Sequence, residues 1–341
     1  WLEMIHLEED GLPSSYPAKP GENGRWSLCP ENAGSKKYNV HFIHTPMMLA
    51  DKQGNTPAIM DEGGLIYVLH EEEAAIRKNN DLKFPLVVRS NIYDCVDWML
   101  TSEWDDDDFS NFHASKVNTH WHFLQFDNQS SDGVITGFSN EQSVRPFTML
   151  EKKTDKGLPL PLNTTFTKAA KKGERVITVK NAAQYHPEIE ILIGADNVGG
   201  NEVGRIKSIK GNEITLVRPL KNDHPVKDIV TVEFVRQRFW VDSDVGTVFW
   251  HDHALGRITW GHGGFGTMIV EPVGSTYHNP KTGAPIRSGP LADIRTAEPV
   301  GYGVNGSFRE LLVQLNDSVP HTINIVTAGN PPGQPVEVAL E

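Results

Sequence analysis

Phe84-Pro-Leu-Val-Val-Arg-Ser-Asn91 and Cys95-Val-Asp-Trp-Met-Leu-Thr101 are two runs rich in β-branched and aromatic residues. Such runs favour β-strands, and the short stretch Ile92 to Asp94 between them predicts a tight turn. Similar runs precede them at Tyr38 to Ile43 and at Leu65 to Leu69, separated by Gly and Pro. Many short strands at this spacing predict an all-β sandwich.

The residue pattern changes between Leu158 and His224. Apolar and polar residues alternate with period two from Val203 to Val217, and Lys210-Gly-Asn212 has the composition of a hairpin turn. We expect residues 158–228 to form a small β-module inserted into a loop of the larger domain. Loops tolerate insertions because the entropy of loop closure grows only logarithmically with length.

Five segments are expected along the chain. Residues 1–37, rich in Pro, Gly and Glu, predict an arm over the surface of the next domain. A strand from Val230 to Arg236 should return from the insert to the sandwich. A run from Phe308 to Leu315 predicts the opening strand of another domain, which indicates that the sequence is a fragment. The predicted segments are the arm 1–37, the main domain 38–157 plus 229–275, the insert 158–228, a linker 276–307 without periodic pattern, and a second domain beginning at 308–341.

Bulk composition excludes several classes of protein. The 341 residues suffice for two or three domains, and the 38% hydrophobic content is that of a globular protein. No apolar run approaches the roughly 20 residues that span a bilayer. The net charge of -12 argues against nucleic acid or anionic membrane as a partner.

The chain contains two cysteines, Cys29 and Cys95, too far apart in sequence for a CxxC motif. Sequence alone leaves open whether they form one disulfide or stay free. The chain begins with Trp1 and shows no signal-peptide pattern, so location has to be inferred from chemistry.

Two His-x-His pairs carry the chemistry of this sequence: His120-Trp-His122 and His251-Asp-His253. Residues i and i+2 of a strand point to the same face, so each pair presents two imidazoles side by side. The alternative without function is that these are unrelated surface or core histidines. Two pairs in aromatic and Gly-rich surroundings make that alternative the weaker interpretation. Four imidazoles from neighbouring strands suit copper, zinc, iron or nickel, and copper leads the affinity order.

The flanking residues resemble a known family. Thr119-His-Trp-His122 with Asp132-Gly133 is similar to the first copper motif of multicopper oxidases, the family of laccases and ceruloplasmin. Gly246-Thr-Val-Phe-Trp-His-Asp-His253, followed by Gly263-Gly-Phe-Gly-Thr-Met-Ile-Val270, resembles the second motif. The resemblance covers most of residues 38–273 outside the insert, and is nearest to large bacterial oxidases that include candidate manganese oxidases. It implies cupredoxin-like Greek-key sandwiches, the second starting near residue 308.

The resemblance also implies a role for each motif residue. His120 would ligate a type 2 copper, His122 and His251 would share one type 3 copper, and His253 would ligate the other. Asp132 would lie near the type 2 ion and help deliver protons to bound O2, although an ordinary turn residue before Gly133 is nearly as plausible. Phe123 stands where laccases have Gly.

Half of the family's pattern is missing. Neither His-x-x-His-x-His nor His-Cys-His occurs, and neither cysteine has a histidine within ten residues on either side. A type 1 centre needs a Cys thiolate between histidines. The resemblance therefore implies half of a trinuclear copper cluster and no type 1 copper, with further cupredoxin domains or subunits as partners.

Three other groups are weaker candidates. His262, in a Gly-rich turn, is as plausible a turn residue as an outer partner of the metal ligands. His41 and His44, at a strand end, are a minor candidate for an ion site. The carboxylates of Asp105 to Asp108 suit hard cations such as Mn(II), but a solvated loop is the better interpretation.

The expected function is part of a copper oxidase that couples oxidation of a metal ion such as Mn(II), or of a phenol, to reduction of O2 to water. Copper enzymes that use O2 are mostly exported, so an extracytoplasmic location follows. The main alternative is a copper- or zinc-binding module without turnover. A hydrolytic metal site is a third interpretation, but it leaves the family-like flanks unexplained.

Overall fold

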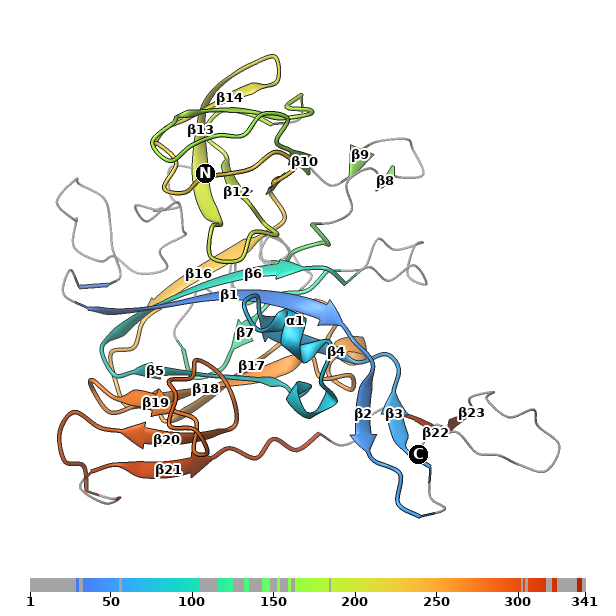
Figure 1. The fold of residues 1–341 in the computed structure, drawn as a ribbon, viewed down its shortest axis with the longest axis vertical. Coiled ribbons are helices and arrows are strands. Elements are labelled where there is room, and N and C mark those ends of the chain that lie inside the picture. Colours follow the sequence, from blue (N-terminus) through green and yellow to red (C-terminus); the bar gives the residue numbers. More distant parts are fainter. Residues whose placement is uncertain are drawn as a thin grey trace.

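The chain folds into a β-sandwich that carries further sheets at its margins (Figure 1). The computed structural model describes residues 29–30, 33–54, 57–104, 116–124, 132–134, 143–147, 152–153, 159–160, 163–183, 185–301, 303, 306–316, 321–323 and 336–338.

The sandwich consists of two four-stranded sheets. The first contains, in order, β16 (Val235–Trp240), β6 (Asp94–Ser102), β1 (Gly34–His44) and β4 (Leu65–Leu69). The second contains β5 (Leu86–Asn91), β18 (Phe265–Glu271), β17 (Thr247–His251) and β7 (His120–Trp121).

Alternation along the strands creates the core between these sheets. Tyr38, Val40 and Phe42 of β1 point inward, and Ile43 lies in a separate cluster on the outer face. Trp98 and Trp250 fill the centre with less than 2% exposure. Their indole rings lie 4.8 Å apart in an edge-to-face arrangement, which aromatic pairs prefer.

The pairing pattern confirms the expected all-β sandwich. β1 pairs with β6 and β5 with β18 in parallel, while the other pairs of both sheets are antiparallel. The predicted turn between β5 and β6 is present, and it carries the chain from one sheet to the other rather than forming a hairpin.

The insert contains a six-stranded sheet with its own core. The predicted strand from Val230 to Arg236 is in fact two strands: β15 stays in the insert, and β16 joins the sandwich. Between them, the Thr231 hydroxyl accepts a hydrogen bond from the Glu233 N–H at 2.8 Å, which turns the chain. The order of the sheet is β10 (Thr164–Thr165), β15 (Ile229–Thr231), β12 (Glu190–Ile193), β13 (Glu202–Lys210), β14 (Glu213–Leu216) and β11 (Val176–Thr178).

Smaller elements complete the described chain. The expected linker 276–307 contains β19 and β20, and β20 pairs with β21, so this segment is not without regular structure. Whether residue 308 begins another domain stays a prediction. The remaining elements are β19 (Thr276–His278), β20 (Leu291–Arg295), β21 (Phe308–Leu311), β2 (Met47–Ala50), β3 (Ile59–Asp61), β22 (His321–Ile323), β23 (Val336–Val338), β8 (Lys152–Lys153), β9 (Pro159–Leu160), α1 (Glu73–Ile76), η2 (Asn80–Leu82) and α2 (Gly256–Thr259).

The two cysteines form a disulfide, Cys29–Cys95, with Cα atoms 5.7 Å apart. It attaches the segment before β1 to the start of β6. Most of the predicted arm, residues 1–28, lies outside the described residues. No helix among the described residues has the length and apolarity to cross a membrane.

Candidate metal centre

The two His-x-His pairs meet at one end of the second sheet. β7 pairs with β17 in the register Trp250 to Trp121 and His251 to His120. Because side chains alternate, the two tryptophans enter the core while the two histidines lie on the other face. His122 and His253 follow directly after these strands, so both pairs reach the same place.

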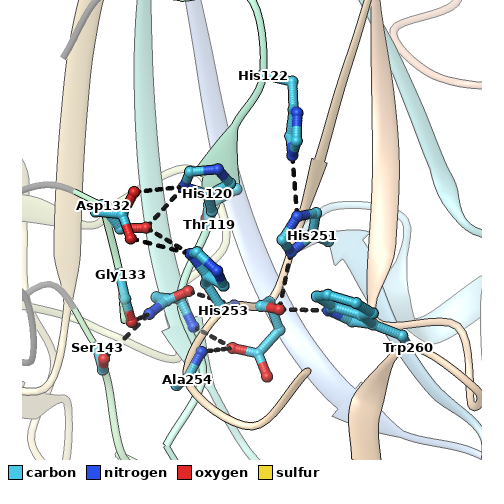
Figure 2. Close-up of polar contacts among 12 residues, drawn as sticks. Thr119, His120, His122, Asp132, Gly133, Ser143, His251, His253, Ala254 and Trp260 are labelled. Carbon is cyan, nitrogen blue, oxygen red and sulfur yellow. Dashed lines mark hydrogen bonds and ion pairs between the residues drawn. The ribbon is translucent and has the colours of Figure 1, made fainter. Parts of the chain in front are cut away.

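All four imidazoles converge, as the strand pattern predicts (Figure 2). The Nε2 atoms of His122 and His251 lie 3.0 Å apart. The ring centroids of His120 and His253 lie 4.3 Å apart, and that of His251 lies 5.1 Å from His120 and 5.2 Å from His253.

Backbone carbonyls fix the orientation of three rings. The carbonyl oxygen of Asp132 accepts from Nδ1 of His120 at 2.7 Å and from Nδ1 of His253 at 3.1 Å. The carbonyl oxygen of Asp252 accepts from Nδ1 of His251 at 3.0 Å. A carbonyl can only accept, so each Nδ1 carries the proton and each Nε2 keeps its lone pair.

The local environment favours the uncharged form of His120, His122 and His251. Burial lowers the pKa of His251 to about 4, and the neighbouring imidazoles contribute in the same direction. Burial and the nearby His253 also lower the pKa of His120 and the pKa of His122. Contacts with Asp132 act to raise the pKa of His120, but burial outweighs them. Neutral imidazole is the form that ligates metals, so the donor set fits copper or zinc at neutral pH.

Asp132 lies between the two motifs. Its carboxylate oxygens are 3.2 Å from Nδ1 of His253 and 3.6 Å from Nδ1 of His120, and its side chain is 23% exposed. It also precedes Gly133, whose φ of 91° suits a glycine turn. The structure therefore places Asp132 beside the histidines, and its role in proton delivery stays a prediction.

Sequence inspection missed Asp252, the central residue of the second pair. Its side chain is fully buried and accepts hydrogen bonds from the N–H groups of Asn118, Ala254 and Leu255 and from the Thr259 hydroxyl. Burial raises the pKa of Asp252 against these hydrogen bonds, which lower it. A residue between two strand histidines must face the interior, which is the pattern that would have revealed it.

Asn118 and Trp260 are two further supports. The Asn118 amide donates to the Gly133 carbonyl at 2.5 Å and accepts from the His253 N–H at 2.9 Å, so it joins both motifs. The Trp260 ring packs edge-on against His251 with centroids 4.5 Å apart, and its Nε1–H donates to the Asp252 carbonyl. Neither has a distinctive spacing in the sequence.

Phe123 adopts a left-handed backbone conformation with φ of 62°. Glycine is the residue that adopts this conformation without strain, which explains why glycine fits this position in the related motif. Phe123 is 71% exposed, and its ring lies edge-on to that of Phe249.

The weaker candidates lie elsewhere. His262 bonds to Asp61 at 2.8 Å and does not reach the four histidines. His41 and His44 do not share an ion site: at three residues apart in one strand they face opposite sides, and exposed His44 bonds to the Glu62 carbonyl. Asp105 to Asp108 lie outside the described residues.

Comparisons with known proteins complete the description. No family model matches this sequence, and no curated protein matches it. Among solved structures, a multi-copper oxidase from Pseudomonas thermotolerans shares 13% sequence identity with this chain at a TM-score of 0.29. The match covers 75% of this chain and 37% of that protein's chain. Fet3p, a multicopper oxidase that functions in iron import, shares 12% identity at a TM-score of 0.26, covering 70% of this chain and 24% of its own. A third structure, a multicopper oxidase, shares 12% identity at a TM-score of 0.20, covering 72% of this chain and 92% of its own. The chain thus spans less than two fifths of the length of the first two of these proteins, to which it is similar in part.

Proposed function

We propose that this chain supplies half of the trinuclear copper cluster of a multicopper oxidase. The observation that carries the proposal is the convergence of four imidazoles from two His-x-His segments, three of which are oriented through Nδ1 by backbone carbonyls. Four nitrogen donors in one place exceed what a single catalytic zinc ion usually takes from a protein, which favours a cluster.

Each histidine has a proposed place. His120 holds the type 2 copper, His122 and His251 share one type 3 copper, and His253 holds the other. The contact of 3.0 Å between the Nε2 atoms of His122 and His251 supports their sharing of one ion, since ligand nitrogens lie about 2 Å from a bound metal.

The chain's own residues orient these ligands and manage protons. The carbonyls of Asp132 and Asp252 fix three rings, which raises the basicity of the ligating nitrogens. Asp132 is partly exposed and lies beside His120 and His253, and in this proposal it passes protons from solvent towards the cluster. When bound, copper would supply the electron transfer that reduces O2 to water.

The electron entry site must come from elsewhere. The chain has two cysteines and both belong to the disulfide, so neither offers the thiolate that a type 1 copper requires. Further cupredoxin domains or subunits would supply it with the remaining cluster ligands. The donor would be a metal ion such as Mn(II), or a phenol.

The disulfide also favours a second, simpler candidate, a copper- or zinc-binding module without turnover, because it leaves the chain no thiolate ligand. It further supports an extracytoplasmic location, since disulfides persist in oxidising compartments.

Metal binding and oxygen uptake test the proposal. The chain should bind copper with Nε2-imidazole signatures in electron paramagnetic resonance, and His251→Ala should lose this copper while His278→Ala, at a histidine bonded to the Gly283 carbonyl, should keep it. Equal copper binding by all three proteins would refute the four-histidine site.

Oxygen uptake separates the oxidase from the module. The copper-loaded chain should not consume O2 with a phenol or with Mn(II), and adding a partner that carries His-Cys-His and His-x-x-His-x-His strands should start turnover. Turnover by the chain alone would contradict the half-cluster, and failure of every such partner would favour the module.

A further inference from the structure

A second group of histidines lies on the outer face of the first sheet, the face turned away from the main core. His41 of β1 pairs in register with Val68 of β4, and His70 follows the end of β4. Alternation places both rings on the outer face, with Ile43, Ile66 and Val68, whereas the main core occupies the inner face. Helix α1 covers this outer face through Ile76 and brings Glu73 to the same place.

The three side chains form a compact cluster. His41 is 3% exposed and His70 is 8% exposed, and their rings stack with centroids 3.9 Å apart. Nδ1 of His41 lies 2.9 Å from Oε2 of Glu73. One nitrogen or oxygen atom from each residue falls within 4.8 Å of the others, a spacing that suits ligands of a single ion.

The pairing of His41 with Glu73 leaves one buried atom unsatisfied. Nδ1 of His70 is buried and has no hydrogen-bond partner in the described part of the chain. Buried polar atoms are nearly always satisfied by a protein group, water or an ion. Burial lowers the pKa of His70 to about 4; the nearby His41 acts in the same direction and Glu73 acts against it.

Glu73 is held ready for the same position. Its other oxygen, Oε1, accepts from Nε of Arg77 at 2.7 Å, and Arg77 is also paired with Glu103 at 2.8 Å. The arginine therefore fixes the carboxylate so that Oε2 faces the two imidazoles.

We propose that His41, His70 and Glu73 form a second metal site, which binds one divalent transition ion of the zinc class. Two imidazole nitrogens and one carboxylate oxygen are a common protein donor set for Zn(II), with the fourth position left to water. The ion would link β1, β4 and α1, replace the hydrogen bond between His41 and Glu73, and satisfy His70. The site does not depend on the copper cluster, from which the main core separates it.

Zinc binding tests this site in a protein whose four-histidine centre has been removed by His120→Ala and His251→Ala. That background protein should bind one Zn(II) per chain, measured by elemental analysis after dialysis, and its thermal unfolding should shift upward with Zn(II). Adding Glu73→Gln, which keeps the side-chain volume, should weaken Zn(II) binding. Loss of a group that only orients a ligand costs about 10–100-fold in affinity, and loss of the ligand Glu73 should cost more than that. His44→Ala, which removes an exposed histidine of the same strand, is the matched control and should change neither quantity.

Either of two Zn(II) results would overturn the proposal, as would one Co(II) result given below: a background protein that binds no Zn(II), or unchanged Zn(II) affinity on Glu73→Gln. Circular dichroism checks that each variant is folded. Glu73→Gln also changes the contact between Glu73 and Arg77. Co(II) absorption of the site that keeps Glu73 therefore provides a second measurement. Bands of a four-coordinate site that Zn(II) abolishes support it, and a spectrum of hydrated Co(II) refutes it. Since the four-histidine centre is absent, failure here would leave the copper proposal untouched.

Discussion

Successive residues at the metal centre, at and just beyond the end of β17, point in opposite directions. In His251-Asp-His253 the two imidazoles face the site while the Asp252 carboxylate, fully buried, gathers the N–H groups of the turn that follows. The same residue's carbonyl orients His251 and accepts from Trp260. Stability of the turn and orientation of the ligand therefore depend on one residue.

Asp252→Asn should reduce both the free energy of unfolding and the metal affinity. An amide nitrogen would face N–H donors that now find a carboxylate oxygen, which costs about 1–3 kcal/mol for a buried unsatisfied group. A loosened turn would also let the backbone carbonyl of residue 252 shift away from His251, which should weaken copper binding about 10–100-fold. Denaturant titration and copper competition measure the two effects, and the exposed Asp242→Asn should change stability by no more than about 0.5 kcal/mol.

Phe123→Asn should stabilise the chain. Asparagine tolerates the left-handed conformation that Phe123 holds at φ of 62°, where a bulky residue costs roughly 1–2 kcal/mol. The gain should be smaller than that, because the edge-on contact with Phe249 is lost. Urea unfolding is the measurement. Phe123→Val, β-branched at the same φ, should destabilise, and a stabilised valine variant would show that backbone strain is absent.

The sequence predicted the site residues that share a strand, because their spacing is local. It did not reveal the residues that reach the site from separate turns and loops. The i, i+2 rule located all four histidines and predicted their convergence. Asn118 reaches Gly133 and His253 only because three separate loops meet, and no local spacing encodes that meeting. His70 was missed for the same reason: its partner His41 belongs to a different strand, and register depends on the assembled sheet.

At the scale of elements, periodicity predicted most strands of both sheets. It failed between Val230 and Arg236, where one apolar run spans two sheets because a hydroxyl of Thr231 turns the backbone. It also failed in the segment 276–307, whose strands β19 and β20 are short and flanked by Pro and Gly. Short strands obtain their order from pairing rather than from their own pattern.

The insert should show pH-dependent stability through His224. This side chain is fully buried, and its two ring nitrogens contact Asp228 at 2.9 Å and Glu202 at 3.1 Å. Burial acts to lower the pKa of His224, but both carboxylates outweigh it and raise that pKa above its ordinary value. A raised pKa stabilises the folded state below about pH 6.5, the unfolded value, and this contribution is lost as pH rises through the folded pKa.

Thermal unfolding between pH 5.5 and 9 should therefore show that the stability of the parent, relative to that of His224→Gln, falls as pH rises. Other titrating groups, including the buried histidines of the metal centre, are common to both proteins and cancel in the difference. Parallel profiles would show that folding leaves the pKa of His224 unchanged.

At the scale of the whole molecule, the insert touches the sandwich through few apolar side chains. Met99 and Phe147 pack with Leu192, Ala195 and Ile229 in a small cluster of their own. Thr164 pairs directly with Val230, so the chain enters and leaves the insert at one point. The division into domains stays a prediction, and this junction is where it can be tested.

Replacing the insert with a short Gly/Ser linker should leave the four-histidine site intact. Paired strand residues lie about 5 Å apart, so a linker of a few residues closes the gap without moving the sandwich. Copper affinity should stay within about twofold of the parent, since distant sites are nearly additive. Stability should fall modestly because Met99 and Phe147 become exposed. Complete loss of the fold would show that the insert belongs to the core.

The hydrogen-bonded pair His122 and His251 is separated by 129 residues of chain, and the whole insert lies between them. Contacts of such range form late, because loop closure costs entropy before the contact repays it. A nascent chain would therefore complete its insert sheet, built from local hairpins, well before its four imidazoles meet. Copper arriving early would find only isolated histidine pairs, so metal loading should follow folding and leave the folding rate unchanged.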